Sequence, residues 1–202
     1  PHGMGLAPTP SRDSAGCRTL PALRKGGLTL DALAALARSW DPFETALGMA
    51  AINACCNRYD LQGEAGNGLD SLAGGDGRVV VIGGFPGIER HLPGCHVIER
   101  EPAAGQYPET AAEWLLADAE AVVATASTLA NRSLPRLLQQ ARGARFALVG
   151  PSATLSPRLF SYGIEALSGL VVTDPEGMAQ AVATGAGARD VKAFGRAVTL
   201  RP

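Results

Sequence analysis

Short apolar runs alternate with helical patterns through the second half of the chain. We predict strands at residues 79–82, 96–99, 121–124, 146–149 and 170–173. We predict helices at residues 86–91, 108–116, 133–142, 157–162 and 175–184. Strands that alternate with helices are typical of parallel βαβ units. The pattern therefore predicts an α/β protein with a Rossmann-like parallel sheet and helices on both faces.

Two further helices are predicted ahead of this sheet, at residues 28–40 and 42–57. The second has the clearer start signal. Asp41 is a natural N-cap, Pro42 fits the first helical position, and Glu44 stands where a capping box has a carboxylate. One face of this helix carries apolar and small residues that would let another element approach closely: Phe43, Leu47, Ala50, Ala51 and Ala54.

A glycine-rich polar segment at residues 62–77 separates the two halves of the pattern. We therefore predict that residues 1–61 belong to a small domain with two helices, that 62–77 is a linker, and that 78–202 is the Rossmann-like domain. The chain begins at Pro1 without a methionine, in a segment typical of the middle of a domain. We expect part of the small domain to be missing.

Charge and cysteine content narrow the partners and the compartment. The net charge is −1 and no Lys/Arg cluster occurs, which argues against nucleic acid or an acidic membrane as a partner. Since no run of 18 apolar residues and no signal-like segment is present, we expect a soluble, cytoplasmic protein. The four cysteines (Cys17, Cys55, Cys56 and Cys95) have no CxxC spacing, so we expect reduced thiols.

Hydroxyl-rich loops follow two neighbouring predicted strands, at residues 125–131 and 150–154. They contain Thr125, Ser127, Thr128 and Asn131 in the first loop and Ser152 and Thr154 in the second. In open parallel sheets, ligands bind beyond the carboxyl ends of the strands, and loop N–H groups suit anionic oxygens. Ser and Thr are also ordinary helix caps. Because two such loops follow strands of one sheet, we favour a ligand crevice.

The loop at residues 83–87 follows the first strand, where a dinucleotide fingerprint would lie. Its spacing is GGxxG rather than GxGxxG, and Pro86 lacks a backbone donor, so it is not that fingerprint. Gly83 and Gly84 permit either close approach of a ligand or a tight turn. Glu99 ends the second strand, where ribose-binding acids lie in nucleotide-binding sheets. It is either a ligand acceptor or a solvated strand end.

Metal-competent side chains gather around the second strand: His91, Cys95, His96, Glu99 and Glu101. Their spacing matches no established metal signature, and alternation along a strand places His96 and Glu99 on opposite faces. A surface loop is the simpler interpretation. The metal hypothesis is a transition-metal ion held by Cys95, His96 and Glu99.

Six segments resemble one known family. They are GMAAINA (48–54), VIGGFPGI (81–88), ExxP (99–102), TASTLANRSL (125–134), GPSATLSPRLFSYGIEALSG (150–169) and VxD (172–174). Together they are similar to the putative heavy-metal chelation family of unknown function. Its members have a Rossmann-like domain after a small enolase-N-like domain. The resemblance therefore implies that an incomplete α+β domain precedes the sheet.

The resemblance implies positions for a site but no established reaction. The matching positions are Gly83, Gly84, Pro86, Glu99, Thr125, Asn131, Gly150, Pro151 and Ser152. The chain departs from the family pattern at Ala126, where Gly is common, at Ser133, where Thr is usual, and at Glu120, where Asp is typical.

Three functional hypotheses follow. The first is a protein that binds a metal or a metal chelate, with the ligand held by Gly83, Gly84, Pro86, Glu99, Thr125, Ser127, Asn131, Gly150 and Ser152. The second is an enzyme acting on a nucleotide, pterin or tetrapyrrole-like metabolite, with Glu99 orienting a hydroxyl or serving as a base. The third is a homo-oligomerising module, suggested by the small-residue helix at 42–57.

Overall fold

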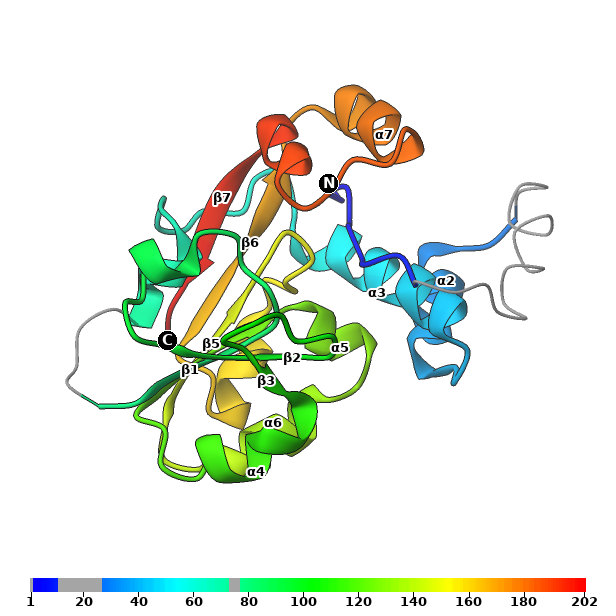
Figure 1. Cartoon of the computed structure of the whole chain (residues 1–202). Helices are drawn as coiled ribbons and strands as arrows, with labels where there is room; N and C mark the ends of the chain where they lie inside the picture. The colour runs from blue at the N-terminus through cyan, green and yellow to red at the C-terminus, as the bar shows by residue number, and fades with distance from the viewer. Residues whose placement is uncertain (1, 11–26, 73–76) are drawn as a thin grey trace.

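The computed structural model describes residues 2–10, 27–72 and 77–202 (Figure 1). These residues contain a seven-stranded sheet with the order β3-β2-β1-β4-β5-β6-β7. The strands are β1 (Val79–Ile82), β2 (His96–Glu99), β3 (Tyr107–Pro108), β4 (Ala121–Thr125), β5 (Arg145–Val149), β6 (Ala166–Val172) and β7 (Gly195–Leu200). Neighbouring strands pair in parallel except β6 and β7, which are antiparallel. The predicted α/β fold is confirmed.

Apolar side chains cover both faces of the sheet, as a parallel sheet requires. On one face, Val122 and Phe146 pack with Leu137 in a cluster that also holds residues of the helices after β3 and β4. On the other face, Val123 packs with Leu72 and neighbouring residues. Because both faces are buried, β1 and β4 read as continuous apolar runs rather than as alternating ones.

The helices are shorter than the patterns predict. The α-helices are α2 (Leu30–Ala35), α3 (Pro42–Cys56), α4 (Ala112–Leu115), α5 (Ser127–Ala130), α6 (Leu134–Gln140) and α7 (Pro175–Ala183). The 3₁₀ turns are η2 (Leu36–Arg38), η3 (Gly68–Leu72), η4 (Ile88–Arg90), η5 (Glu109–Ala111), η6 (Pro157–Tyr162) and η7 (Asp190–Phe194). Strand β7 and turn η7 were not predicted. The predicted helix at 108–116 is wrong at its start. Pro108 is extended and belongs to β3, where it pairs with Glu99 of β2.

Helix α3 starts as predicted, and its small residues allow another segment to approach closely. Asp41 Oδ1 accepts hydrogen bonds from the N–H groups of Phe43 (2.9 Å) and Glu44 (3.1 Å). The Asp41 N–H donates to Ser39 Oγ, and Ser39 Oγ donates to Glu44 Oε2, so the box is closed through Ser39. The buried residues of α3 are Thr45, Ala46, Gly48, Ala51 and Asn53. The amino-terminal segment approaches the predicted stripe at Ala50 and Ala54, since a Cβ added at Gly5 would overlap the Ala50 carbonyl oxygen. The Gly3 N–H donates to the Ala54 carbonyl at 2.8 Å.

The described part of the glycine-rich segment packs on the sheet. Glu64 and Thr199 exchange two backbone hydrogen bonds, of 2.9 and 2.8 Å. Leu69 and Leu72 of η3 are buried beneath the strands. Residues 73–76 of the predicted linker lie outside the described residues, and the proposed domain limits stay a prediction.

Two other expectations concern the state of the cysteines and the presence of a membrane-spanning helix. Cys55, Cys56 and Cys95 are free thiols, and Cys17 lies outside the described residues. Within residues 2–10, 27–72 and 77–202, no helix is long and apolar enough to cross a membrane.

Candidate functional site

A cavity of about 850 Å³ lies at the carboxyl ends of the central strands. Strand β1 is flanked by β2 on one side and β4 on the other, so the chain turns in opposite directions on leaving β1 and β4. Ligands of open α/β sheets bind at such a switch point. The cavity wall includes six of the nine predicted ligand residues: Gly83, Gly84, Glu99, Thr125, Ser127 and Asn131.

Two glycines after β1 leave room for side chains at the ends of the neighbouring strands. Gly83 has φ +98°, and a Cβ added there would lie 2.6 Å from Thr125 Cγ2. A Cβ added at Gly84 would lie 2.7 Å from Glu99 Oε1. Of the two, only Gly83 needs glycine for its backbone conformation. The GG pair therefore lets the Thr125 and Glu99 side chains lie against the loop that follows β1.

Glu99 presents a carboxylate at the end of β2. Its Oε2 accepts a hydrogen bond from the Arg100 N–H at 3.0 Å. The Arg100 side chain lies 3.6 Å from Glu109 Oε1. The cavity wall thus carries three carboxylates, from Glu99, Glu101 and Glu109, against one guanidinium. This balance favours an uncharged or cationic ligand.

Hydroxyl and amide groups line the cavity after β4. Thr125 Oγ1 accepts hydrogen bonds from Ser127 Oγ (3.3 Å) and from the Ser127 N–H (3.5 Å). Asn131 Oδ1 accepts from the N–H (3.0 Å) and Oγ (2.7 Å) of Ser133. These local bonds fix the orientation of the side chains. Hydroxyls keep acceptor capacity when they donate, so the group can still hydrogen-bond a polar ligand.

The loop after β5 has a different place. Gly150 and Ser152 do not line the cavity, although the sequence predicted both as ligand residues. Asn53 of α3 donates through Nδ2 to the Ser152 carbonyl at 2.9 Å. Asn53 Oδ1 accepts from Thr154 Oγ1 at 2.6 Å. The loop is therefore fastened to α3.

Asn57, which follows α3, completes this contact. Its Nδ2 donates to the Ala153 carbonyl at 2.8 Å, and its Oδ1 accepts from the Leu155 N–H at 2.9 Å. Asn53 and Asn57 are 0% and 1% exposed. Within the described residues, no buried side-chain N or O atom is left without a partner. We call this contact the asparagine clamp, formed by Asn53 and Asn57 on residues 152–155. The sequence analysis missed this contact. Its signal was a pair of asparagines, which are weak helix formers, four residues apart at the end of a predicted helix.

The predicted metal ligands do not come together. His96 packs edge-to-face on Tyr107, with ring centroids 5.5 Å apart. Cys95 packs against the apolar cluster under β1, and burial raises its pKa, with a smaller contribution from the charge of Glu89. Across the described ranges, no three His, Cys, Asp or Glu side chains are placed to hold a metal ion. His96 and Glu99 stand at opposite ends of β2, about 10 Å apart along the strand. Pro86 is exposed and outside the cavity wall.

The amino-terminal part of the chain supplies the opposite wall of the cavity. Pro8, Thr9, Pro10 and Pro42 line it. Arg132, at the end of the β4 loop, donates to the carbonyls of Ala37 (3.1 Å) and Ser39 and stacks over the Trp40 ring at 4.2 Å. The sequence analysis missed these residues, since only the folded chain brings them to the site.

The sheet order and the crevice at its switch point define an α/β protein of the Rossmann-like class. The chain belongs to the DUF364 family, described as putative heavy-metal chelation, whose model matches residues 68–201. A second model with the same description, DUF4213, matches residues 1–56. No curated protein matches the chain.

Two crystal structures of DUF364 proteins of unknown function are similar to this chain. The protein from Desulfitobacterium hafniense DCB-2 is 32% identical and has a TM-score of 0.85, with 100% of this chain and 84% of that chain covered. The protein from Pyrococcus horikoshii is 23% identical and has a TM-score of 0.79, with 88% and 76% covered. The second likeness shows the fold alone.

Proposed function

We propose that the crevice between the ends of β1, β2 and β4 binds a small organic ligand that carries a heavy metal. The observation that carries the proposal is the 850 Å³ cavity at the switch point, with Glu99, Thr125 and Ser127 in its wall. The family description supports the link to a chelated metal. These protein groups would hold the organic part of the ligand through hydrogen bonds.

A chelate fits the wall better than a bare ion. Glu99 ends β2, Thr125 and Asn131 stand at the two ends of the β4 loop, and all three already accept hydrogen bonds from nearby residues of the chain. Such separated groups suit the scattered donors and acceptors of an organic molecule. A chelate brings its own metal donors and requires only binding and orientation from the protein.

Calorimetric titration tests this proposal. The probes are Co²⁺ alone, cobinamide (a cobalt chelate of the tetrapyrrole type) and the cobalt complex of 1,10-phenanthroline. We expect at least one chelate to bind more tightly than Co²⁺. Thr125→Val should weaken that binding by about fivefold, the value of one hydrogen bond. Ser152→Ala, outside the wall, should leave it unchanged. Equal effects of the two variants, or no binding of either chelate, would overturn the proposal.

Glu99 supports a second candidate, an enzyme acting on a nucleotide, pterin or tetrapyrrole-like metabolite. A carboxylate at the end of the second strand is where such sheets bind a ribose hydroxyl. In this role Glu99 orients a hydroxyl or accepts a proton. Incubation of such metabolites with the wild type and Glu99→Gln, followed by mass spectrometry, tests it. A product formed equally by both proteins would rule out this role for Glu99.

Two further expectations remain proposals. They are a cytoplasmic location and a homo-oligomer formed through α3. Scattering over a concentration series checks the second: a constant mass equal to one chain would contradict it.

A further inference from the structure

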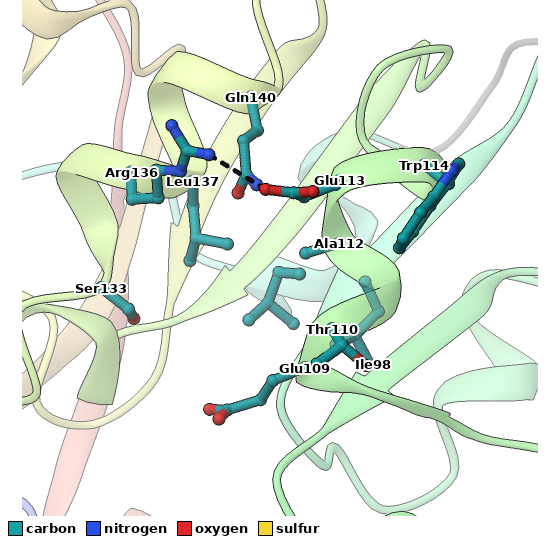
Figure 2. Close-up of a pocket in the computed structure, with 11 residues that line it drawn as sticks. Ile98, Glu109, Thr110, Ala112, Glu113, Trp114, Ser133, Arg136, Leu137 and Gln140 are labelled. Carbon is teal, nitrogen blue, oxygen red and sulfur yellow. Dashed lines mark hydrogen bonds and ion pairs between the residues drawn. The ribbon is translucent and has the colours of Figure 1, made fainter.

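A second hollow of about 570 Å³ lies between α4 and α6 (Figure 2). Its floor is apolar, with Ile82 and Ile98 from the ends of β1 and β2, Ala112 from α4, and Leu137 from α6. Figure 2 shows Ala112 and Leu137 projecting from the two helices toward the same space. We call this hollow the side pocket. Its volume can hold a bicyclic ring, and apolar walls favour the flat face of such a ring.

The side pocket continues into the crevice described above. Four residues line both hollows: Ile82, Ile98, Glu109 and Ser133. Ile98 and Glu99 are the last two residues of β2, and both line the crevice. A ligand whose polar part lies on Glu99 therefore has an apolar space beside it.

Charges around the combined hollow are mainly negative. Four carboxylates line it, from Glu99, Glu101, Glu109 and Glu113, against the guanidiniums of Arg100 and Arg136. Each guanidinium lies close to a carboxylate: Arg100 is 3.6 Å from Glu109, and Arg136 is 3.1 Å from Glu113 at the rim (Figure 2). This field repels a phosphate and attracts a cation.

The loop at residues 83–87 is also poorly suited to bind a phosphate. Gly83 donates its N–H to the Ile98 carbonyl at 2.9 Å, so that donor is in use. Pro86 has no N–H to offer. Two of the five residues of the loop, Gly83 and Pro86, therefore offer no N–H group to a pyrophosphate.

We propose that the combined hollow binds an uncharged or cationic nucleoside, with its base in the side pocket and its ribose diol on Glu99. The carboxylate at the end of β2 accepts the two ribose hydroxyls, and the base lies between Ala112 and Leu137. This inference rests on the proposed function for the crevice itself, and its ligand belongs to the class given there as the second candidate. The ligand is a nucleoside rather than a nucleotide.

Calorimetric titration with adenosine, AMP and ribose tests the ligand class. We expect adenosine to bind, AMP to bind at least tenfold more weakly because of its phosphate, and ribose to give no measurable heat. AMP binding as tightly as adenosine would overturn the charge argument. Ribose binding as tightly as adenosine would overturn the place given to the base.

Ala112→Leu tests the side pocket itself, since the larger side chain fills the space meant for the base. We expect adenosine affinity to fall at least tenfold. Ala111→Leu is the matched control, because Ala111 is the preceding residue and does not line the pocket, and it should bind like the wild type. Circular dichroism checks the fold of both. If Ala112→Leu does not fold, Ala112→Val replaces it, with an expected decrease of at least threefold.

The outcomes separate this inference from the proposed function. Cobalt chelate binding that depends on Thr125, without adenosine binding at millimolar concentration, overturns the nucleoside and leaves the crevice standing. Loss of both overturns both proposals. Equal adenosine affinity in Ala112→Leu and Ala111→Leu places the base elsewhere and overturns the inference.

Discussion

The loops after β4 and β5 are chemically alike but have different surroundings. Both are short, rich in hydroxyls, and follow neighbouring parallel strands of the sheet. The β4 loop, residues 125–131, lines the cavity. The β5 loop, residues 150–156, is covered by α3 and fastened by the asparagine clamp. The same kinds of side chain thus face a ligand space in one loop and a helix in the other.

The difference lies in what covers each loop. Hydroxyls and carbonyls after a strand need partners, and either a ligand or a neighbouring element can supply them. At the β5 loop, α3 supplies them through Asn53 and Asn57. At the β4 loop, the amino-terminal segment forms the far wall through Pro8 and Pro10 and leaves a cavity between. A family block with a clear sequence signature can therefore mark a contact inside the molecule.

The largest expected effect is on the clamp. Asn57→Ala leaves the Ala153 carbonyl and the Leu155 N–H without their side-chain partner in a buried site. We expect a loss of about 3 kcal/mol in the free energy of unfolding, since each unsatisfied group costs about 1–3 kcal/mol. Urea denaturation measures it. Asn131→Ala, in the β4 loop, removes two exposed hydrogen bonds from Ser133 and should cost about 1 kcal/mol or less. Similar losses in the two variants would remove the distinction between the loops.

Gly83→Ala is next, because it strains the backbone and crowds the β4 loop. The residue has φ +98°, and the new methyl would lie 2.6 Å from Thr125 Cγ2. We expect about 2 kcal/mol of destabilisation by urea denaturation. Gly84→Ala is the comparison. Its methyl meets only the end of the Glu99 side chain, so stability should change by less than about 1 kcal/mol while ligand affinity falls. A larger loss at Gly84 would contradict this assignment.

Arg132, which follows the β4 loop, connects this loop to the amino-terminal part of the chain. Its guanidinium bonds the carbonyls of Ala37 and Ser39 and stacks on Trp40, while its own φ is +64°. We expect Arg132→Ala to cost about 1.5 kcal/mol of unfolding free energy. Arg132→Gly should cost about 1 kcal/mol less than Arg132→Ala, because glycine adopts this backbone conformation without strain. Thermal denaturation of the pair measures the difference. If glycine is the worse variant, backbone strain at this position is unimportant.

The smallest expected effect is the pH dependence of stability at Cys56, which lies beside the β5 loop. Burial raises the pKa of Cys56, and the neighbouring Cys55 adds to this, while a hydrogen bond with Ser156 lowers it. A thiol with a raised pKa stabilises the fold below its ordinary value of 9.0 and loses that contribution as the pH rises through the raised value. We expect the stability advantage of the wild type over Cys56→Ala to shrink above pH 9. Urea midpoints at pH 8 and pH 10 check it, and a constant difference would contradict the assignment.

Much of the fold could be predicted because its signals are local. The Asp41 cap was predicted from neighbouring residues, and strands β1 and β2 begin and end as their apolar runs indicate. Strand β7 was not predicted. It pairs antiparallel with β6, whereas the βαβ pattern used for the prediction indicates only parallel strands. The start of β3 at Tyr107 was missed for a similar reason, since Pro108 reads as the first residue of a helix until Glu99 pairs with it.

The candidate site divides along the same line. The sequence by itself placed Gly83, Glu99 and Thr125 at strand ends, and the parallel sheet brings such ends to one edge for geometric reasons. Only the tertiary structure decided which polar loop α3 covers and that α4 and α6 leave an apolar pocket beside Glu99. Strand ends and caps depend on residues a few positions apart. Which loop a helix covers depends on contacts between residues about a hundred positions apart, such as Asn53 and Ser152. The local sequence pattern does not indicate such contacts.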